Sequence, residues 1–170
     1  EVCRQKVYEM AEITGQSITI ALEVLDQYDD AKAKEVIKIE KLVDKYEDAL
    51  GSYLVRLSGK NISAKDGKSL SIILHTISDF ERISDHARNV INSAKEINKK
   101  GLSFSKNAKD ELDVLSRAVK DICKLTINSF CTENKELAAH VEPLEEVVDT
   151  LSKRMKKHHI KRLQNGRCTI

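Results

Sequence analysis

The chain is poor in aromatic residues and in proline. Its 170 residues include no tryptophan and one proline, and aromatic residues make up only 4% of the sequence. The bulk is Leu, Ile, Val, Ala, Glu, Lys and Asp, with 33% charged residues. This composition is typical of an all-helical soluble protein, and the length is sufficient for one domain with a sizeable core.

Other absences exclude whole classes of protein. No stretch approaches the ~20 apolar residues of a membrane-spanning helix, and the start of the given sequence shows no signal-peptide pattern. The net charge of +2 does not indicate a nucleic-acid-binding protein. The four cysteines form no Cys-x-x-Cys pair, so we expect idle or buried thiols in a reducing compartment. Because the sequence starts at Glu1 without an initiator Met, we expect it to be cut from a longer chain.

Apolar residues recur at helical spacing in five segments, which predicts five helices. Asp29 and Asp30 are candidate N-caps for the second, and Ser63 and Asp66 form a capping-box-like start for the third. Pro143 falls inside the fifth segment, where a helix must either kink or begin, and we favour a kink. The predicted segments are about 7–28, 36–57, 63–99, 107–130 and 135–163.

The second half of the chain resembles the first. A shift of 105 residues places Glu40 on Glu145 and Asp44 on Asp149, and apolar positions also coincide. We therefore predict a tandem duplication, with a first three-helix repeat at residues 1–104 and a second at residues 105–170. The second repeat stops where its third helix should begin. The expected fold is all-α, with tandem three-helix-bundle repeats of which the second lacks its last helix.

One acidic pattern, Glu-x-x-x-Asp, occurs three times within the helical segments. On a helix each pair shares one face, and two such acids repel by about 0.2–0.5 kcal/mol. Repeated repulsion suggests a metal site with oxygen ligands, which suit Mg, Ca, Mn or Fe better than structural Zn. The alternative is a solvated face paired with nearby Lys and Arg. The predicted ligands are Glu40, Asp44, Glu81, Asp85, Glu145 and Asp149. We expect the second and third helices to be antiparallel neighbours, because the connection between them is short, and the first four acids to cluster on one exposed face of that pair.

Two residues beside the second acidic pair are secondary candidates. His86 follows Asp85 directly, so it points about 100° away on an ideal helix and could join a site only from its edge. Asn89 lies one turn beyond Asp85. A surface role for both is the competing interpretation.

The C-terminal end is basic, with no Asp or Glu after Asp149. Two interpretations remain open. The cations can complement the helix dipole and pair with acids on the missing last helix of the second repeat, or they can contact anionic lipid headgroups or an acidic partner.

Three segments resemble one known family. The stretch Asp79–Val90, with Glu81-Arg82-Ile83-Ser84-Asp85-His86-Ala87 at its centre, is similar to the signature of the PhoU family. The segment Val141–Asp149 resembles the motif of that family's second repeat. The tail His158–Cys168 is similar to that of PhoU-like domains fused behind the membrane domain of a sodium/phosphate cotransporter.

This resemblance implies a non-catalytic, helical cytoplasmic domain that regulates phosphate uptake and is tethered to the cell membrane through a transporter. It also implies metal binding on the acidic motifs, with Fe, Zn, Mn or Mg as candidates. The alternative is a free-standing PhoU-type regulator that contacts a transporter and a sensor kinase. A di-metal oxidase of the four-helix-bundle type is disfavoured, because Ser84 and Val148 stand where its Glu-x-x-His motifs need His.

The fifth segment carries an apolar stripe that its own repeat leaves partly uncovered. Such a surface is typical of an interaction site, so we predict a twofold homodimer through the fourth and fifth helices. The stripe consists of Leu144, Val148, Leu151, Met155 and Ile160.

Overall fold

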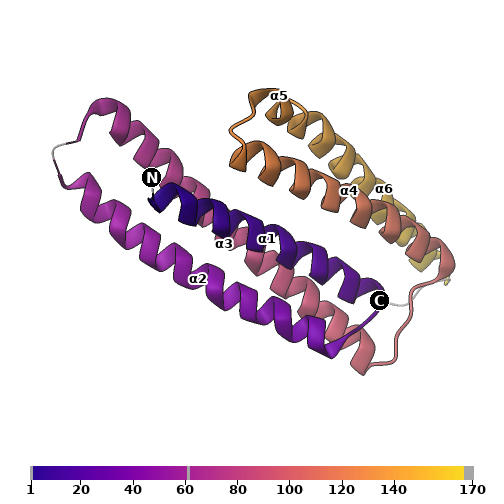
Figure 1. Ribbon diagram of the computed structural model, residues 1–170. Helices are drawn as coiled ribbons and strands as arrows, with labels where there is room; N and C mark the ends of the chain where they lie inside the picture. Colours follow the sequence, from indigo (N-terminus) through magenta and orange to yellow (C-terminus); the bar gives the residue numbers. More distant parts are fainter. Residues whose placement is uncertain (1, 61, 167–170) are drawn as a thin grey trace. The chain divides into compact units, whose positions relative to one another are not determined.

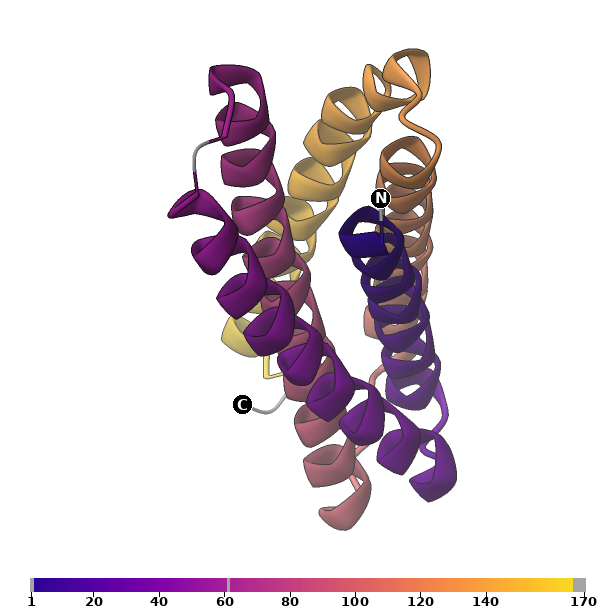
Figure 2. The ribbon, with the colours of Figure 1, turned by 60° about the vertical axis from the view of Figure 1, so that its left-hand side comes forward.

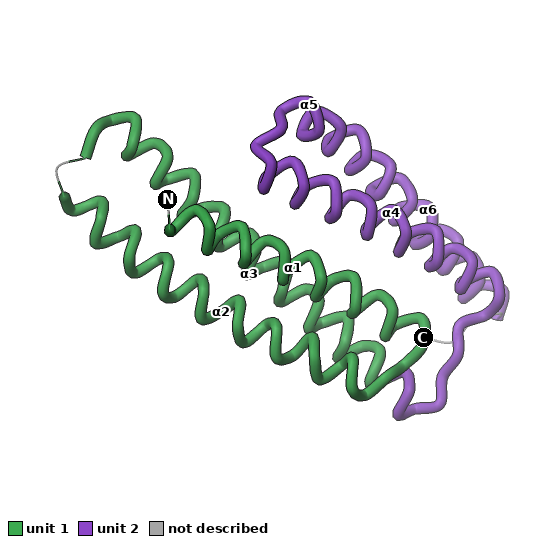
Figure 3. The backbone as a smooth tube through the Cα atoms, in the orientation of Figure 1, with its two compact units in different colours: residues 1–96 green, residues 97–170 purple. Residues whose placement is uncertain are grey.

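The computed structural model describes residues 2–60 and 62–166. All regular structure in these two ranges is helical, which confirms the all-α fold class (Figure 1). The chain divides into two compact units, residues 1–96 and 97–170 (Figure 3). The helices are α1 (Val2–Asp26), α2 (Asp30–Ser58), α3 (Ala64–Lys99), α4 (Lys106–Cys131), α5 (Lys135–Ala138) and α6 (Val141–Gln164).

In the first unit, α1, α2 and α3 form a three-helix bundle (Figures 1 and 2). The hydroxyl of Tyr46 on α2 donates to Glu9 on α1, with an O–O distance of 3.0 Å. The hydroxyl of Ser78 on α3 donates to Glu47 on α2 at 3.2 Å, and Arg88 further along α3 donates to Glu40 earlier on α2. The later residue on α3 thus contacts the earlier residue on α2. This confirms that α2 and α3 are antiparallel neighbours.

An apolar core holds this bundle together. A large apolar side chain buried in this core contributes about 1.5–3 kcal/mol to the free energy of unfolding, whereas an exposed ion pair contributes about 0–1 kcal/mol. Packing therefore dominates the stability of the first unit. The larger buried apolar residues are Val7, Met10, Ile18, Val24, Val36, Val43, Leu50, Leu54, Leu70, Ile77, Phe80 and Ile91.

The predicted helix starts are confirmed in their atomic detail. The carboxylate of Asp29 accepts from the backbone N–H groups of Ala31 and Lys32, at 2.8 and 3.0 Å. The hydroxyl of Ser63 accepts from the N–H of Asp66 at 3.1 Å and donates to its carboxylate at 2.6 Å. Both caps satisfy N–H groups that have no partner within the helix.

The predicted fifth helix is divided, so the expectation of one kinked helix is wrong. Helix α5 ends at Ala138, and α6 begins at Val141. Pro143 has no N–H, and its ring crowds the carbonyl of the residue four positions earlier, Ala139. In the first turn of α6 the missing N–H costs nothing, because no helical acceptor faces it there.

The second unit consists of α4, α6 and the short α5. The carboxylate of Glu111 on α4 accepts from Arg162 on α6 at 2.9 Å and contacts Nδ1 of His158 at 2.5 Å. Helix α6 contains no buried residue, and Ser129 is the buried residue of α4. This unit therefore has a much thinner core than the first. The tandem duplication, with its boundary at residue 104, stays a prediction.

Two further expectations concern cysteines and membrane spans. Cys3 and Cys123 are free thiols, whereas Cys168 and the neighbouring Arg167 lie outside the described residues. None of the described helices combines the length and the apolar character that crossing a bilayer requires.

Candidate functional site

Four predicted ligands come together on the α2–α3 pair of the first unit. Glu40 and Asp44 lie on α2, and Glu81 and Asp85 lie on α3. Asp85 interacts electrostatically with both Asp44 and Glu81, and Asp44 interacts with Glu81. Antiparallel packing therefore places the two Glu-x-x-x-Asp motifs opposite each other. We call these four residues the acidic cluster.

Mutual repulsion changes the titration of two members of the acidic cluster. Partial desolvation raises the pKa of Asp44, and the carboxylates of Glu40 and Asp85 raise it further, against the opposing effect of Arg88. Desolvation likewise raises the pKa of Glu81, with Asp85 and Asp44 adding to it. The cluster thus favours a proton or another cation more than isolated surface acids do.

Glu40 differs from the other three because it is buried, so the expectation that all four share one exposed face is wrong for this residue. Val36 and Val43 are also buried, and Glu40 falls between them on the core side of α2. Its Oε1 accepts from Arg88 Nη1, which compensates the charge. Its Oε2 finds no hydrogen-bond partner among the residues that the structure describes.

A fifth acid, Glu47, belongs to the same surface and was not among the predicted ligands. It accepts from Ser78 on α3 and contributes to the raised pKa of Glu81. Glu47 lies three residues after Asp44 and seven after Glu40, so helical spacing alone could have identified it.

The remaining predicted ligands are not brought into this cluster by any described contact. His86 and Asn89 are exposed on α3, and neither is among the groups that shift the pKa of Asp44 or Glu81. Glu145 and Asp149 are exposed on α6, in the second unit. Asp149 is paired with Lys153 at 2.5 Å, as in an ordinary solvated helix face.

The acidic cluster has the oxygen ligands that a cation needs, but its side chains are not arranged around a metal position. Within residues 2–60 and 62–166, no three His, Cys, Asp or Glu side chains are arranged to hold a metal ion. Oxygen donors nevertheless match hard and borderline cations, and the unsatisfied Oε2 of Glu40 is a spare acceptor.

The family model of the PhoU domain matches residues 7–94, just over half of the chain. The chain belongs to the PhoU family. The matched range contains α2, most of α3 and therefore the entire acidic cluster.

The chain matches relatives over most of its own length and about 70% of theirs, at low identity. It is 24% identical over 157 residues to a phosphate-specific transport system accessory protein PhoU homolog of Clostridium acetobutylicum, covering 91% of this chain and 70% of that protein. It is 21% identical over 166 residues to PhoU homolog 1 of Thermotoga maritima, covering 96% and 70%. The crystal structure of PhoU from Pseudomonas aeruginosa has the same fold, with a TM-score of 0.89 and 21% identity over 98% of this chain and 80% of that one.

Proposed function

We propose that this chain is a non-catalytic accessory protein of phosphate transport, which regulates uptake by binding to a transporter. The observation that carries the proposal is the PhoU-domain match over residues 7–94. The names of the relatives, which describe accessory proteins of a phosphate-specific transport system, support the substrate class.

The proposal includes a role for the acidic cluster. Asp44, Glu81 and Asp85 would hold a divalent cation, with Fe, Mn, Zn and Mg as candidates, and Glu40 would join them when Arg88 moves away. The bound ion would supply positive charge that removes the repulsion between the carboxylates. The raised pKa values of Asp44 and Glu81 support this role, because a group that favours a proton also favours a metal ion in its place.

Two contexts are compatible with this function. Fusion to a sodium-dependent phosphate cotransporter is supported by the sequence of the tail at His158–Cys168. A free-standing regulator is supported at least as well, by the names of the relatives. An antibody against this chain, followed by mass spectrometry of the endogenous polypeptide, distinguishes them. Peptides from a multi-span membrane region on the same polypeptide indicate fusion, and an intact mass without such a region indicates a free-standing protein.

In either context the role requires a location at the cytoplasmic face of the membrane. The basic residues of α6, which include Lys153, Lys156, Lys157 and Lys161, support contact with anionic headgroups or an acidic partner. We also propose a homodimer through α4 and α6. It is supported by the lack of buried residues on α6 and by the exposure of Val147 and Ile160.

The test of the function is a gene deletion in the source organism. Uptake of radioactive phosphate is measured at high and low external phosphate, with and without the gene restored. We expect the deletion to disturb the response of uptake to external phosphate, and the wild-type gene to restore it. An uptake response that is unchanged by the deletion at both concentrations would refute the proposal.

A further inference from the structure

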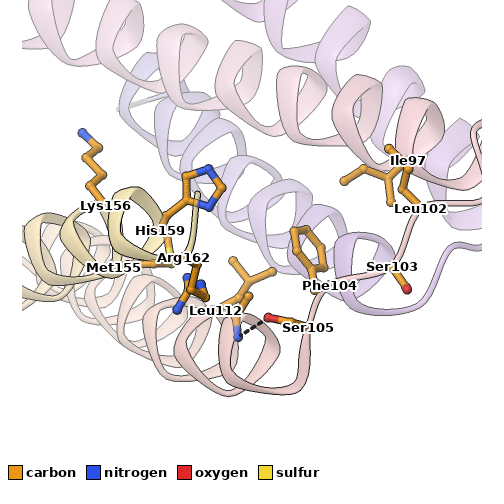
Figure 4. A pocket seen from close by; sticks show the side chains of 11 residues that line it. Ile97, Leu102, Ser103, Phe104, Ser105, Leu112, Met155, Lys156, His159 and Arg162 are labelled. Atoms are coloured by element: carbon orange, nitrogen blue, oxygen red, sulfur yellow. Dashed lines mark hydrogen bonds between the residues drawn. The ribbon is translucent and has the colours of Figure 1, made fainter. Parts of the chain in front are cut away.

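The second unit contains a pocket of about 370 Å³ at the end where α4 begins and α6 ends (Figure 4). Pockets that bind small molecules in proteins are commonly about 300–1,000 Å³, largely apolar, with a few polar groups. This pocket lies within residues 97–170 and shares no residue with the acidic cluster. It is independent of the proposed function.

One side of the pocket is apolar and open to solvent. Leu102 and Phe104 lie on the segment that leads into α4, and they are 53% and 44% exposed. Ile97 and Leu112 extend the same lining (Figure 4). Two large exposed apolar side chains beside a cavity are the kind of surface that a ligand covers.

The opposite side of the pocket is cationic. Lys156, His159 and Arg162 line it, and their three-residue spacing places them along one face of α6. Figure 4 shows the amine of Lys156 directed away from the other labelled side chains, whereas His159 and Arg162 lie closer to Phe104 and Leu112. The N-terminus of α4, capped by Ser105, adds the positive end of a helix dipole.

Arg162 carries the strongest indication of an absent partner. Its Nη1 donates to Glu111 at 2.9 Å, and its side chain is only 14% exposed. Its Nε is buried and has no acceptor among the described residues. A guanidinium group normally satisfies its donors with carboxylate or phosphate oxygens. Arg162, a residue that lines the pocket beside its apolar wall, thus has one donor satisfied by Glu111 and one, Nε, without an acceptor.

We propose that this pocket binds a single-chain carboxylic acid, with its carboxylate against Arg162 and His159 and its hydrocarbon chain along Phe104, Leu102 and Ile97. A small inorganic anion would leave the apolar wall exposed. A cationic amphiphile would be repelled by the guanidinium of Arg162, and a neutral one would offer Nε only an uncharged and therefore weaker acceptor. An acid with an apolar chain satisfies both sides of the pocket.

Calorimetric titration of the intact chain tests the ligand class. Decanoate is compared with decyltrimethylammonium, inorganic phosphate and phosphatidylglycerol vesicles. Decanoate and decyltrimethylammonium are used below the concentrations at which they form micelles. We expect decanoate to bind at least tenfold more tightly than the cation of equal chain length or phosphate. Equal binding of the cation, equal binding of phosphate, or vesicle binding without decanoate binding would overturn the proposal.

Two variants locate the binding. Phe104→Ser changes an exposed side chain, so the fold tolerates it, and it should weaken decanoate binding at least tenfold. Tyr53→Ser, which alters an exposed aromatic residue of α2 in the first unit and outside the pocket lining, should leave binding unchanged. Arg162→Lys keeps the charge facing Glu111 but removes Nε, and it should weaken decanoate binding without a loss of helical circular dichroism. Wild-type affinity in both Phe104→Ser and Arg162→Lys would overturn the proposal.

Discussion

Arg88 on α3 donates a hydrogen bond from Nη1 to the buried Oε1 of Glu40 on α2. The Glu40 side chain is 3% exposed, whereas that of Arg88 is 50% exposed. The half-exposed partner thus comes from α3 and the buried partner from α2. Arg88 supplies the positive charge closest to Glu40, and a cation bound to the acidic cluster would compete with it.

Arg88→Ala is expected to destabilise the first unit, because it leaves the Glu40 carboxylate buried without its donor. The loss should be about 1–3 kcal/mol in the free energy of unfolding, measured by urea denaturation. Arg82→Ala is the matched control, since Arg82 is exposed and its contact with Asp79 is 3.7 Å long. It should change stability by less than about 0.5 kcal/mol. Equal effects of the two variants would contradict the importance of the buried pair.

Asp44→Asn and Glu81→Gln are expected to stabilise the metal-free protein at neutral pH. Both acids have raised pKa values in the folded state. Their contribution to stability is therefore present below their ordinary pKa values and is lost as pH rises through the raised ones. Each relieved like-charge pair should return about 0.2–0.5 kcal/mol at pH 7.

The same variants supply the pH control. Below about pH 4 the wild-type carboxylates become protonated, so the advantage of the variants should disappear there. Thermal unfolding of the metal-free proteins across this range is the measurement. Variants less stable than wild type at pH 7 would show that the cluster is not repulsive.

The elements of the first unit could be predicted from the sequence because its apolar stripes have one period and its caps have specific chemistry. The stripe through Val36 and Val43 predicts α2, and Asp29 marks its start. The burial of Glu40 was missed because two patterns compete there. Its spacing to Asp44 indicates a shared exposed face, whereas its position between two valines places it in the core.

Other features depend on tertiary contacts that a single sequence does not encode. The division between α5 and α6 follows from Pro143, whose two possible outcomes the sequence leaves open. The pairing of Glu111 with His158 and Arg162 joins residues 47 and 51 positions apart. No local pattern marks such a pair. The pocket beside Phe104 arises in the same way, from a connecting segment that meets the end of α6.

Asp29→Ala is expected to destabilise α2 by about 1 kcal/mol, because two backbone N–H groups lose their acceptor. Glu35→Ala, an exposed acid in the second turn of the same helix, is the control and should have little effect. Chemical denaturation monitored by circular dichroism measures both. A loss of similar size in the two variants would indicate a general charge effect rather than capping.

Leu151→Glu and Met155→Glu are expected to shift the protein from dimer to monomer or to unfold its second unit, because each places a charge in the apolar stripe of α6. Thr150→Glu, at an exposed position of the same helix, should leave the association unchanged. Sedimentation velocity measures the association state, and an apolar dye reports exposed surface. A wild-type protein that stays monomeric with little dye binding would exclude the predicted dimer.

The most direct test of the central claim is the metal content of the purified protein after incubation with Fe, Mn or Zn and removal of free ions. We expect the wild type to retain metal. Asp44→Asn combined with Glu81→Gln should retain almost none, and Asp110→Asn combined with Asp121→Asn, which changes two exposed acids of the second unit, should match the wild type. A second double variant, Glu40→Ala combined with Glu81→Ala, is measured beside them. If both this variant and the Asp44/Glu81 variant retain as much metal as the wild type, these carboxylates are ordinary surface acids.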